Sequence, residues 1–534
     1  MSNLNEQAVV KQKKDCYSYH NFQFPFRWSS NNNQTKKNSF DVLNVKLVEP
    51  NLWERKPFKL DNILAYNEYR YFYSFVRDVI YDRADETDQI QCKHYELGIS
   101  DKAEYQITLK DKIYVLEIES ITLDLYELNA GILSFHLFNR KKEQSTPLSI
   151  LKINQYGRRI YLPFFKTEKE DVATAKIFNA ADFAKGLDGS KGIEIAHKIA
   201  LVNLFEENDD IIVEDFSKYN SPANFENGDF PTPKLISGLL EPILVDFTIE
   251  QLLDDRMFVL CWYGNNGIGN RLAYKYSYKN DKWWFKYIYV DARLATCQNS
   301  EMRNHFIENS TNARWADFRT FFGATRYSFV LLTNELSTLK KDKAEFILNH
   351  IQTIYFQMTR MVLLQRVLLL NFSQEINKVS KLKLNEGLIE KVDLLYENYL
   401  TFINKIHFKE ITAQDQGIEL YDMLIDKMRV NRDVDYLSKE MQELHSYVNL
   451  KQQKQQNDES SKLTKIATIF IVPTFVISLL SLIAGQKIDF QASFEWEMLG
   501  YVLFLVVIAL ISIFYVRKRP SKVITWIIKY IDKI

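Results

Sequence analysis

Two short segments combine arginine with tyrosine, residue types that suit recognition of a phosphate and a base. They are "NQYGRR" at 154–159 and "GATRYS" at 323–328. A guanidinium donates two parallel hydrogen bonds to one phosphate, and an aromatic ring stacks on a base. The alternative is that these arginines pair with carboxylates in ordinary surface networks. The candidate ligand-binding residues are Tyr156, Arg158, Arg159, Trp315, Arg326 and Tyr327.

Patterns that support catalysis are absent from the sequence. None of the eight histidines lies in an H-E-x-x-H pattern, and there is no Walker loop, no G-x-S-x-G and no Cys/His metal spacing. The neighbouring Asp254 and Asp255 are typical of a turn or strand edge rather than an acid–base pair. The glycine-rich "NNGIGN" at 265–270 favours a hairpin loop over a phosphate cradle. We therefore predict that the chain is not an enzyme and holds no prosthetic group.

The overall charge gives no sign of a polyanion as partner. Lys and Arg total 68, as do Asp and Glu, so the net charge is zero. A protein that follows a phosphate backbone usually has a basic excess, so we expect no direct nucleic-acid binding. The four cysteines are scattered and indicate neither a disulfide framework nor a zinc ribbon.

Near the C-terminus, two apolar runs are long enough to cross a bilayer, which needs about 20 residues of helix. They are 463–484 and 498–516, and basic residues lie before the first and after the second. The turn between them carries Asp489, Glu495 and Glu497. The charge pattern predicts an inner-membrane protein with both termini in the cytoplasm. The alternative is a pair of buried core helices.

The first apolar run has one face of small or polar residues at spacings of three and four. Polar groups in lipid are costly, so this face is expected to contact other helices or water. Several copies around an axis would line a pore with it, whereas tight packing through small residues is the alternative. Pro473 offers a hinge in this helix. The predicted pore-lining residues are Asn457, Ser460, Leu463, Ala467, Ile471, Thr474, Ser478 and Ser481.

Ahead of these runs the sequence predicts strands first and helices later. Alternation at 113–139 predicts two paired strands, and "RMFVLCWYG", "WWFKYIYVD" and "YSFVLLTNE" predict further strands. The run at 351–370 carries Arg360 and Arg366 and predicts a buried helix rather than a span. The expected domains are a cytoplasmic α/β sensor domain at 1–340, a helical region at 341–432, a stalk helix continuing into the first span at 433–484, an outer turn at 485–497, the second span at 498–516 and a basic cytoplasmic tail at 517–534.

The C-terminal pattern resembles that of CorA-type magnesium channels. The resemblance lies in "KLTKIATIFIVPTFVI", a short acidic turn, a second apolar run and "RKR". It implies an α+β cytoplasmic domain, a helical stalk, a two-helix transmembrane hairpin and a homopentamer in the lipid bilayer. It also implies gate residues at Leu463 and Ile471, and it matches Asn457 and Thr474 to pore positions. The Gly-Met-Asn magnesium signature is replaced by Ser481, Leu482 and Ile483.

From this resemblance we expect a pentameric ion channel opened by a ligand on the cytoplasmic domain. Some CorA-like proteins without the magnesium signature accompany type III CRISPR systems, and a resemblance to them implies an antiviral effector. Its ligand would be a nucleotide messenger, either a cyclic oligoadenylate or an S-adenosylmethionine–AMP conjugate. One alternative is a constitutive magnesium transporter in which the acidic outer turn concentrates Mg²⁺. The other is a membrane-anchored sensor or scaffold that conducts no ions.

Overall fold

The computed structural model describes most of the chain up to Gly485. The described residues are 16–30, 52–83, 92–109, 112–160, 198–205, 211–216, 232–244, 247–251, 256–292, 295–339, 341–381 and 386–485. The chain divides into two units, Met1–Met441 and Gln442–Ile534. The sheet and the candidate ligand-binding residues lie in the first unit.

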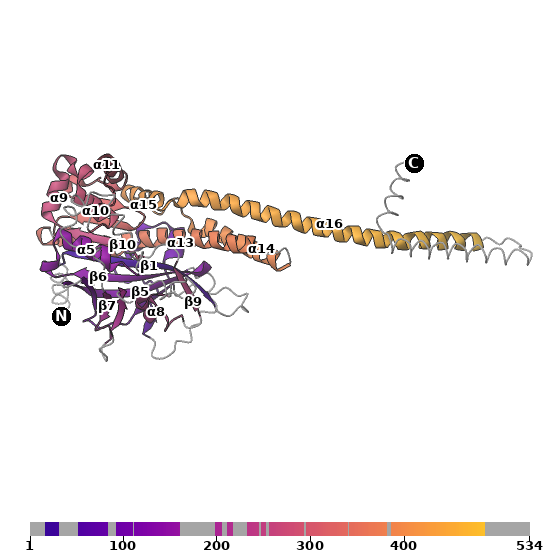
Figure 1. The fold of residues 1–534 in the computed structure, drawn as a ribbon, viewed down its shortest axis with the longest axis horizontal. Coiled ribbons are helices and arrows are strands. Elements are labelled where there is room, and N and C mark those ends of the chain that lie inside the picture. The colour runs from indigo at the N-terminus through magenta and orange to yellow at the C-terminus, as the bar shows by residue number, and fades with distance from the viewer. Residues whose placement is uncertain are drawn as a thin grey trace, which may run out of the picture. The chain divides into compact units, whose positions relative to one another are not determined.

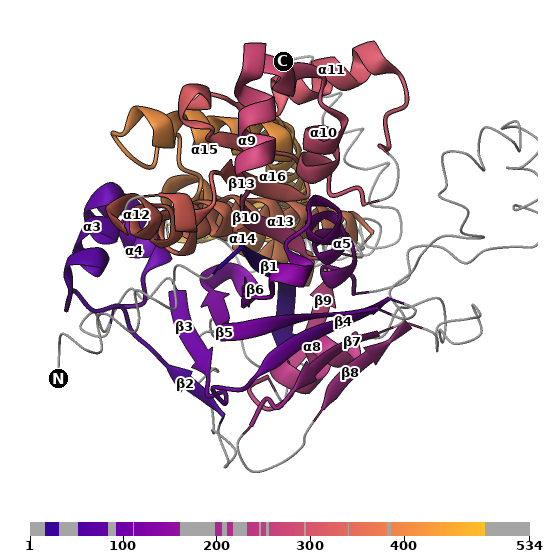
Figure 2. The ribbon, with the colours of Figure 1, turned by 90° about the vertical axis from the view of Figure 1, so that its left-hand side faces the viewer.

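In the described residues, thirteen strands form one mixed sheet. Its main path runs β11-β12-β13-β10-β1-β6-β5-β4-β7-β8, with β2, β3 and β9 paired to its members off this path. Figure 2 shows β4, β7 and β8 side by side at one edge. The strands are β1 Ser18–Ser30, β2 Trp53–Arg55, β3 Cys92–Leu97, β4 Glu104–Leu109, β5 Lys112–Tyr126, β6 Ala130–Asn139, β7 Lys198–Val202, β8 Ile212–Asp215, β9 Phe247–Gln251, β10 Phe258–Gly264, β11 Thr311–Asn312, β12 Phe321–Ala324 and β13 Ser328–Thr333.

The strand predictions are partly correct. The strands expected at 113–139 are β5 and β6, which pair antiparallel, and β10 and β13 are also strands, paired in parallel. The strand predicted at 283–291 is wrong, because Lys282–Tyr289 forms helix α10, with the Asp281 side chain accepting from the backbone N of Trp284 at 2.8 Å. The hairpin loop predicted at "NNGIGN" is also wrong. Asn265 caps helix α9 there and accepts from the backbone N of Ile268.

Helices from α12 onward follow the last strand in the chain, and several of the earlier helices pack on the sheet (Figure 1). Helix α5 contacts β1, β4 and β10, α10 contacts β13, and α13 contacts β1 and β6. The helices are α3 Ile63–Tyr71, α4 Ser74–Ile80, α5 Pro147–Gly157, α8 Lys234–Leu240, α9 Asn266–Ala273, α10 Lys282–Tyr289, α11 Ser300–Asn309, α12 Lys341–Gln352, α13 Ile354–Ser380, α14 Glu386–Thr401, α15 Asp415–Met428 and α16 Val430–Gly485.

Helices pack on both faces of the sheet at its central strand β1. Side chains alternate between the faces of a strand, and two polar residues of β1 show which helix each face contacts. The ring of His20 bonds to Asn154 of α5, whereas the Gln23 amide bonds to Thr359 of α13. Since positions 20 and 23 differ by an odd number, α5 and α13 lie on opposite faces of the sheet.

Helix α13 is almost entirely buried over its first four turns, which confirms the buried helix predicted at 351–370. A buried polar side chain is costly unless it is hydrogen-bonded, and those of α13 bond to separate elements. Gln357 bonds Glu68 of α3, Arg360 bonds Asp124 of β5, and Gln365 bonds the Ile406 carbonyl. Because each bond reaches a different element, α13 fixes the sheet and the surrounding helices to one another.

The prediction of a transmembrane hairpin is contradicted. In the part of the chain that the structure describes, no helix is long and apolar enough to cross a membrane.

This correction extends to every prediction that depended on the hairpin. A membrane protein, an ion channel and an inner-membrane location were predicted, and the same finding contradicts all three. The second apolar run at 498–516, the tail at 517–534 and the acidic residues of the turn, Asp489, Glu495 and Glu497, lie outside the described residues. Helix α16 covers the range 433–484 in which the sequence predicts one long helix.

Candidate functional site

Helix α5 is held against the sheet core at both of its ends. At its start, Thr146 accepts a hydrogen bond from the backbone N of Ser149 at 3.2 Å, and Pro147 occupies the first helical position. At its end, the Tyr105 hydroxyl of β4 donates to the Gly157 carbonyl at 2.6 Å. The helix therefore has little freedom to move, and the residues that follow Gly157 begin from a fixed point.

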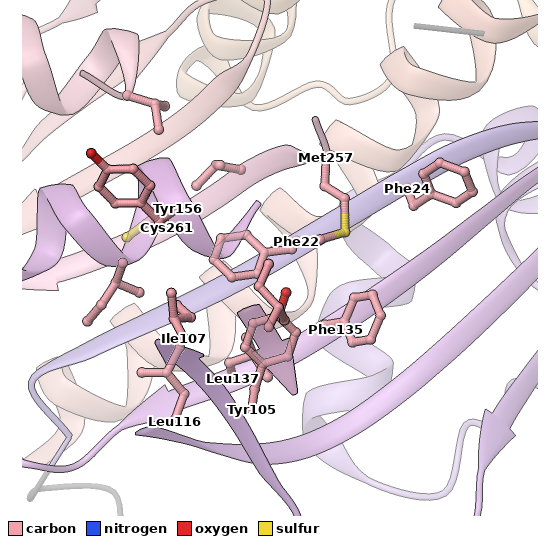
Figure 3. Close-up of a cluster of buried hydrophobic side chains, with 14 of the residues drawn as sticks. Phe22, Phe24, Tyr105, Ile107, Leu116, Phe135, Leu137, Tyr156, Met257 and Cys261 are labelled. Atoms are coloured by element: carbon pink, nitrogen blue, oxygen red, sulfur yellow. The ribbon is translucent and has the colours of Figure 1, made fainter. Parts of the chain in front are cut away.

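Gly157 lets the end of α5 approach the core closely. A Cβ atom at this position would lie 2.8 Å from atoms of both Phe22 and Ile107. Figure 3 shows these two side chains with Tyr105 and Tyr156 in the core cluster around β1. Any larger residue would require α5 or these two side chains to shift, so glycine here permits the close packing from which the following arginines start.

Three arginines from two chain segments meet just beyond α5, and we call Arg158, Arg159 and Arg256 the arginine cluster. Arg158 caps α5, and its carbonyl accepts from the backbone N of Met257 at 2.7 Å. Arg159 and Arg256 form an isolated antiparallel bridge. These backbone contacts hold 158–159 beside 256–257, although about a hundred residues separate the two segments in the sequence.

Aromatic rings position the guanidinium groups of the cluster. The Cζ atoms of Arg158 and Arg256 lie 5.5 and 5.6 Å from the centroid of the Tyr327 ring, and the Cζ of Arg159 lies 4.6 Å from the Tyr156 ring. Such contacts are favourable and limit the rotation of a long side chain. Arg158 is only 3% exposed, whereas Tyr327 is 37% exposed. The cluster therefore combines buried positive charge with a ring that solvent reaches.

One carboxylate lies close to this positive charge. Burial raises the pKa of Asp291, and this effect is opposed by two hydrogen bonds from Thr296 and by the charge of Arg158. The Thr296 backbone N and hydroxyl lie 2.9 and 2.8 Å from the same Asp291 oxygen. Arg158, Arg159 and Arg256 thus bring three guanidinium groups to one place in the fold, and the charge of Arg158 acts on Asp291. An anionic ligand would find a favourable potential there.

A buried serine, histidine and amide lie in line beneath α5. The Ser18 hydroxyl is 2.8 Å from Nε2 of His20, and Nδ1 of His20 is 2.6 Å from Oδ1 of Asn154. This spacing has the form of a nucleophile, a base and an orienting group. However, all three side chains are at most 1% exposed, so no substrate reaches the hydroxyl. We assign the network to positioning of α5, and the expectation that the chain is not an enzyme stays a prediction.

The structure brings some of the predicted ligand-binding residues together and separates others. Arg158 and Tyr327 are in contact, and Arg326 is exposed in the same loop as Tyr327. Tyr156 is fully buried, so its ring is covered by protein. Trp315 lies elsewhere, on the surface formed with α15, where its Nε1 donates to Gln416 at 2.9 Å.

Two residues of the site were missed in the sequence. Arg256 precedes the buried strand β10, and Asp291 follows α10. An arginine at the start of a fully buried strand was the available signal for Arg256, because a strand end places it at the edge of the core. No pattern in the sequence connects Asp291 to the other residues, since its segment is tied to α5 by a tertiary contact in which the Gln155 side chain accepts from the backbone N of Ala292.

The residues predicted to line a pore all lie on α16. Leu463 and Ile471, the predicted gates, are 67% and 63% exposed. The hydroxyls of Ser478 and Ser481 donate to carbonyls of the preceding turn rather than to another element. Asn457, Ser460, Ala467, Pro473 and Thr474 lie along the same helix.

The described residues contain no group of three or more His, Cys, Asp or Glu side chains arranged to hold a metal ion. The acidic turn that suggested Mg²⁺ binding is outside these residues, and Asp254 and Asp255 are as well. No family model, no curated protein and no solved structure matches this chain. The resemblance to CorA-type channels therefore stays a prediction from the sequence.

Proposed function

We propose that this chain is a sensor protein that binds a small phosphorylated ligand, preferably a nucleotide, at the arginine cluster. The observation that carries the proposal is the convergence of three guanidinium groups from two distant segments near the partly exposed Tyr327. Phosphate oxygens accept paired hydrogen bonds from guanidinium, and partial burial strengthens the attraction. Ion conduction is no part of this proposal, since no helix in the described residues can cross a membrane.

The partly exposed Tyr327 supports a nucleotide rather than inorganic phosphate. Its ring is 37% exposed beside Arg158 and Arg256. A base that contacts the ring edge or the guanidinium planes would leave its phosphate to the arginine cluster. Each such stack contributes about 1–3 kcal/mol. The ligands to test first are the ones implied by the resemblance, a cyclic oligoadenylate and an S-adenosylmethionine–AMP conjugate.

Isothermal titration calorimetry of the full chain tests this proposal. The panel is these two ligands together with AMP and inorganic phosphate. Replacing Arg158 and Arg159 by Lys keeps both charges and removes the paired donors, so we expect affinity for the preferred nucleotide to fall at least tenfold. Replacing both by Ala should abolish binding. The matched control is Arg140→Lys, at an arginine that pairs with Glu117 at 2.9 Å on another surface.

Two results would contradict the proposal. One is that the unmodified chain binds none of the four ligands. The other is that the double lysine variant binds as tightly as the unmodified chain. Because Arg158 and Arg159 are buried, circular dichroism must first show that the variants keep the secondary structure of the unmodified chain.

We also propose that α16 mediates self-association of the sensor. It exposes large apolar side chains, namely Leu450, Leu463, Ile466, Ile471, Phe475 and Ile477 at 52–67%, and burial of each would contribute about 1.5–3 kcal/mol. A pentamer is the state that the resemblance implies. Sedimentation of the full chain, compared with a Leu463→Lys, Ile466→Lys variant, tests this, and a monomer at all concentrations would contradict it.

A further inference from the structure

The segment η6, Tyr274–Asn280, holds two consecutive side chains in a strained backbone conformation. Lys275 has φ 46° and Tyr276 has φ 55°, both in the left-handed region. For residues other than glycine this conformation costs about 1–2 kcal/mol each. Tyr274 and Tyr276 are 66% and 54% exposed, so packing in the core does not explain the strain. Backbone strain that exposes aromatic rings is a pointer to binding.

Other residues of this segment contact α9 and the sheet, so the exposed rings lie on a backbone that is held in place. Tyr278 of η6 packs on Phe321 of β12 with ring centroids 5.5 Å apart, and the Ser277 hydroxyl donates to the Arg271 carbonyl at the end of α9. These contacts tie η6 to α9 and the sheet. The orientation of Tyr274 and Tyr276 therefore does not depend on a loose loop.

A second exposed aromatic segment packs against the same helix α9. In η7, Ala316–Phe318, the Phe318 side chain is 62% exposed. The next residue, Arg319, has φ 58°, and its Nε donates to Oδ1 of Asn270 in α9 at 2.9 Å. Segments 274–280 and 316–319 thus both contact one short helix, and each presents at least one exposed aromatic ring and a cation.

Positive charge on this surface is only partly neutralised. Arg271 pairs with Asp281, and Lys279 pairs with Glu308. By contrast, Lys275 lies 5.4 Å from the Tyr274 ring centroid and has no carboxylate within ion-pair distance among the described residues. Arg319 donates to the neutral oxygens of Asn270 and of the Asp317 carbonyl. Cations beside exposed rings suit a ligand that is both anionic and aromatic.

We propose that this surface, formed by Tyr274, Lys275, Tyr276, Phe318 and Arg319, binds single-stranded nucleic acid. Bases stack on the exposed rings, and the two cations contact phosphates of the backbone. A single strand fits better than a duplex, because the faces of paired bases are covered by their neighbours. The zero net charge of the chain does not oppose this inference, since binding of this kind depends on local charge. It is also independent of the arginine cluster.

Fluorescence anisotropy of the full chain with fluorescein-labelled 12-nucleotide single strands tests the proposal, and oligo-dT and oligo-U distinguish DNA from RNA. The diagnostic variant is Tyr276→Gly. Glycine adopts positive φ without strain, so this variant should keep or raise the melting temperature while losing one stacking ring. We expect affinity to fall about 5- to 150-fold, the range that corresponds to one stacked base. The matched control is Tyr66→Ala, since Tyr66 of α3 is 52% exposed.

Two further variants test the roles of charge and of the second segment. Lys275→Gln should reduce the slope of log affinity against log salt by about 0.7, as expected for one lost phosphate contact. Phe318→Ala should weaken binding without changing that slope. The proposal is overturned if neither strand binds at 50 mM salt, if Tyr66→Ala weakens binding as much as Tyr276→Gly, or if a polyglutamate peptide competes as well as the strands. The last result would assign the surface to acidic proteins.

Discussion

The buried ion pair between Arg360 of α13 and Asp124 of β5 offers the sharpest test of what holds the first unit together. The two side chains are 2% and 0% exposed, and a second guanidinium nitrogen of Arg360 donates to the Ile80 carbonyl. Burial alone raises the pKa of Asp124, but the charges of Arg360 and His94 outweigh it and lower the pKa to about 2. The carboxylate is therefore ionised and compensated at neutral pH.

The lowered pKa of Asp124 gives the size of its contribution to folding stability. A fall from 3.8 to about 2 corresponds to about 2 kcal/mol of folding free energy at 1.36 kcal/mol per pH unit. Because the folded pKa is depressed, this stability is present above the unfolded pKa of 3.8 and is lost as pH falls toward 2. Arg360→Met costs more, about 3–5 kcal/mol, because it leaves a buried carboxylate without its partner.

A double-mutant cycle in guanidinium chloride at pH 7, followed by tryptophan fluorescence, measures the pair. Asp124→Asn combined with Arg360→Met removes both charges, so we expect it to cost less than the sum of the single variants by at least about 1.5 kcal/mol. The control is Arg366→Met on the same helix, since its partner Asp433 is 25% exposed and regains water. Additive costs within about 0.5 kcal/mol would refute the reasoning.

Three further predictions concern the elements around this helix. Gly157→Ala, which places a methyl group 2.8 Å from core atoms, should lower the free energy of unfolding by about 1–3 kcal/mol, measured by the same denaturation. Burial lowers the pKa of His20 to about 4 and that of His136 to about 3, so both take up protons on unfolding. Stability should fall as pH decreases from about 6.5 to 4, and His136→Gln should reduce that slope. Asp433→Asn removes an ion pair with α13 and should speed proteolysis of the start of α16, whereas the exposed Asp435→Asn should not.

The sequence revealed local patterns more reliably than long-range pairings. The sequence of β5 and β6 alternates between apolar and polar residues and is interrupted by a turn, and this pattern predicts both strands. The segment "WWFKYIYVD" was misread because its aromatic residues favour strands in general, whereas Asp281 caps it as helix α10. Tertiary context decided between the two, because Trp284, Phe285, Tyr287 and Ile288 are all buried on one side of that helix.

The arginine cluster shows the same limit for the candidate site. Arg158 and Arg159 were recognisable as a pair, but nothing local connects them to Arg256, whose place depends on a single bridge between two loops. Conversely, the residue type of Tyr156 predicts a ligand contact, but its side chain lies in the core. Residue type can therefore suggest a site, whereas the burial of each side chain depends on how the sheet and the helices pack.

The polar side chains of α13 explain why that helix was recognisable as buried rather than membrane-spanning. A helix in lipid has no partner for an arginine or a glutamine, whereas here each such group meets an acceptor or donor on a separate element.

The contacts between these elements also bear on ligand sensing. A ligand that draws Arg158 away from Tyr327 acts on α5, which packs on β1 through His20, and β1 in turn bonds α13 through Gln23. Strand β1 therefore offers one direct path across the sheet from the arginine cluster to α13, because its alternating side chains contact both layers.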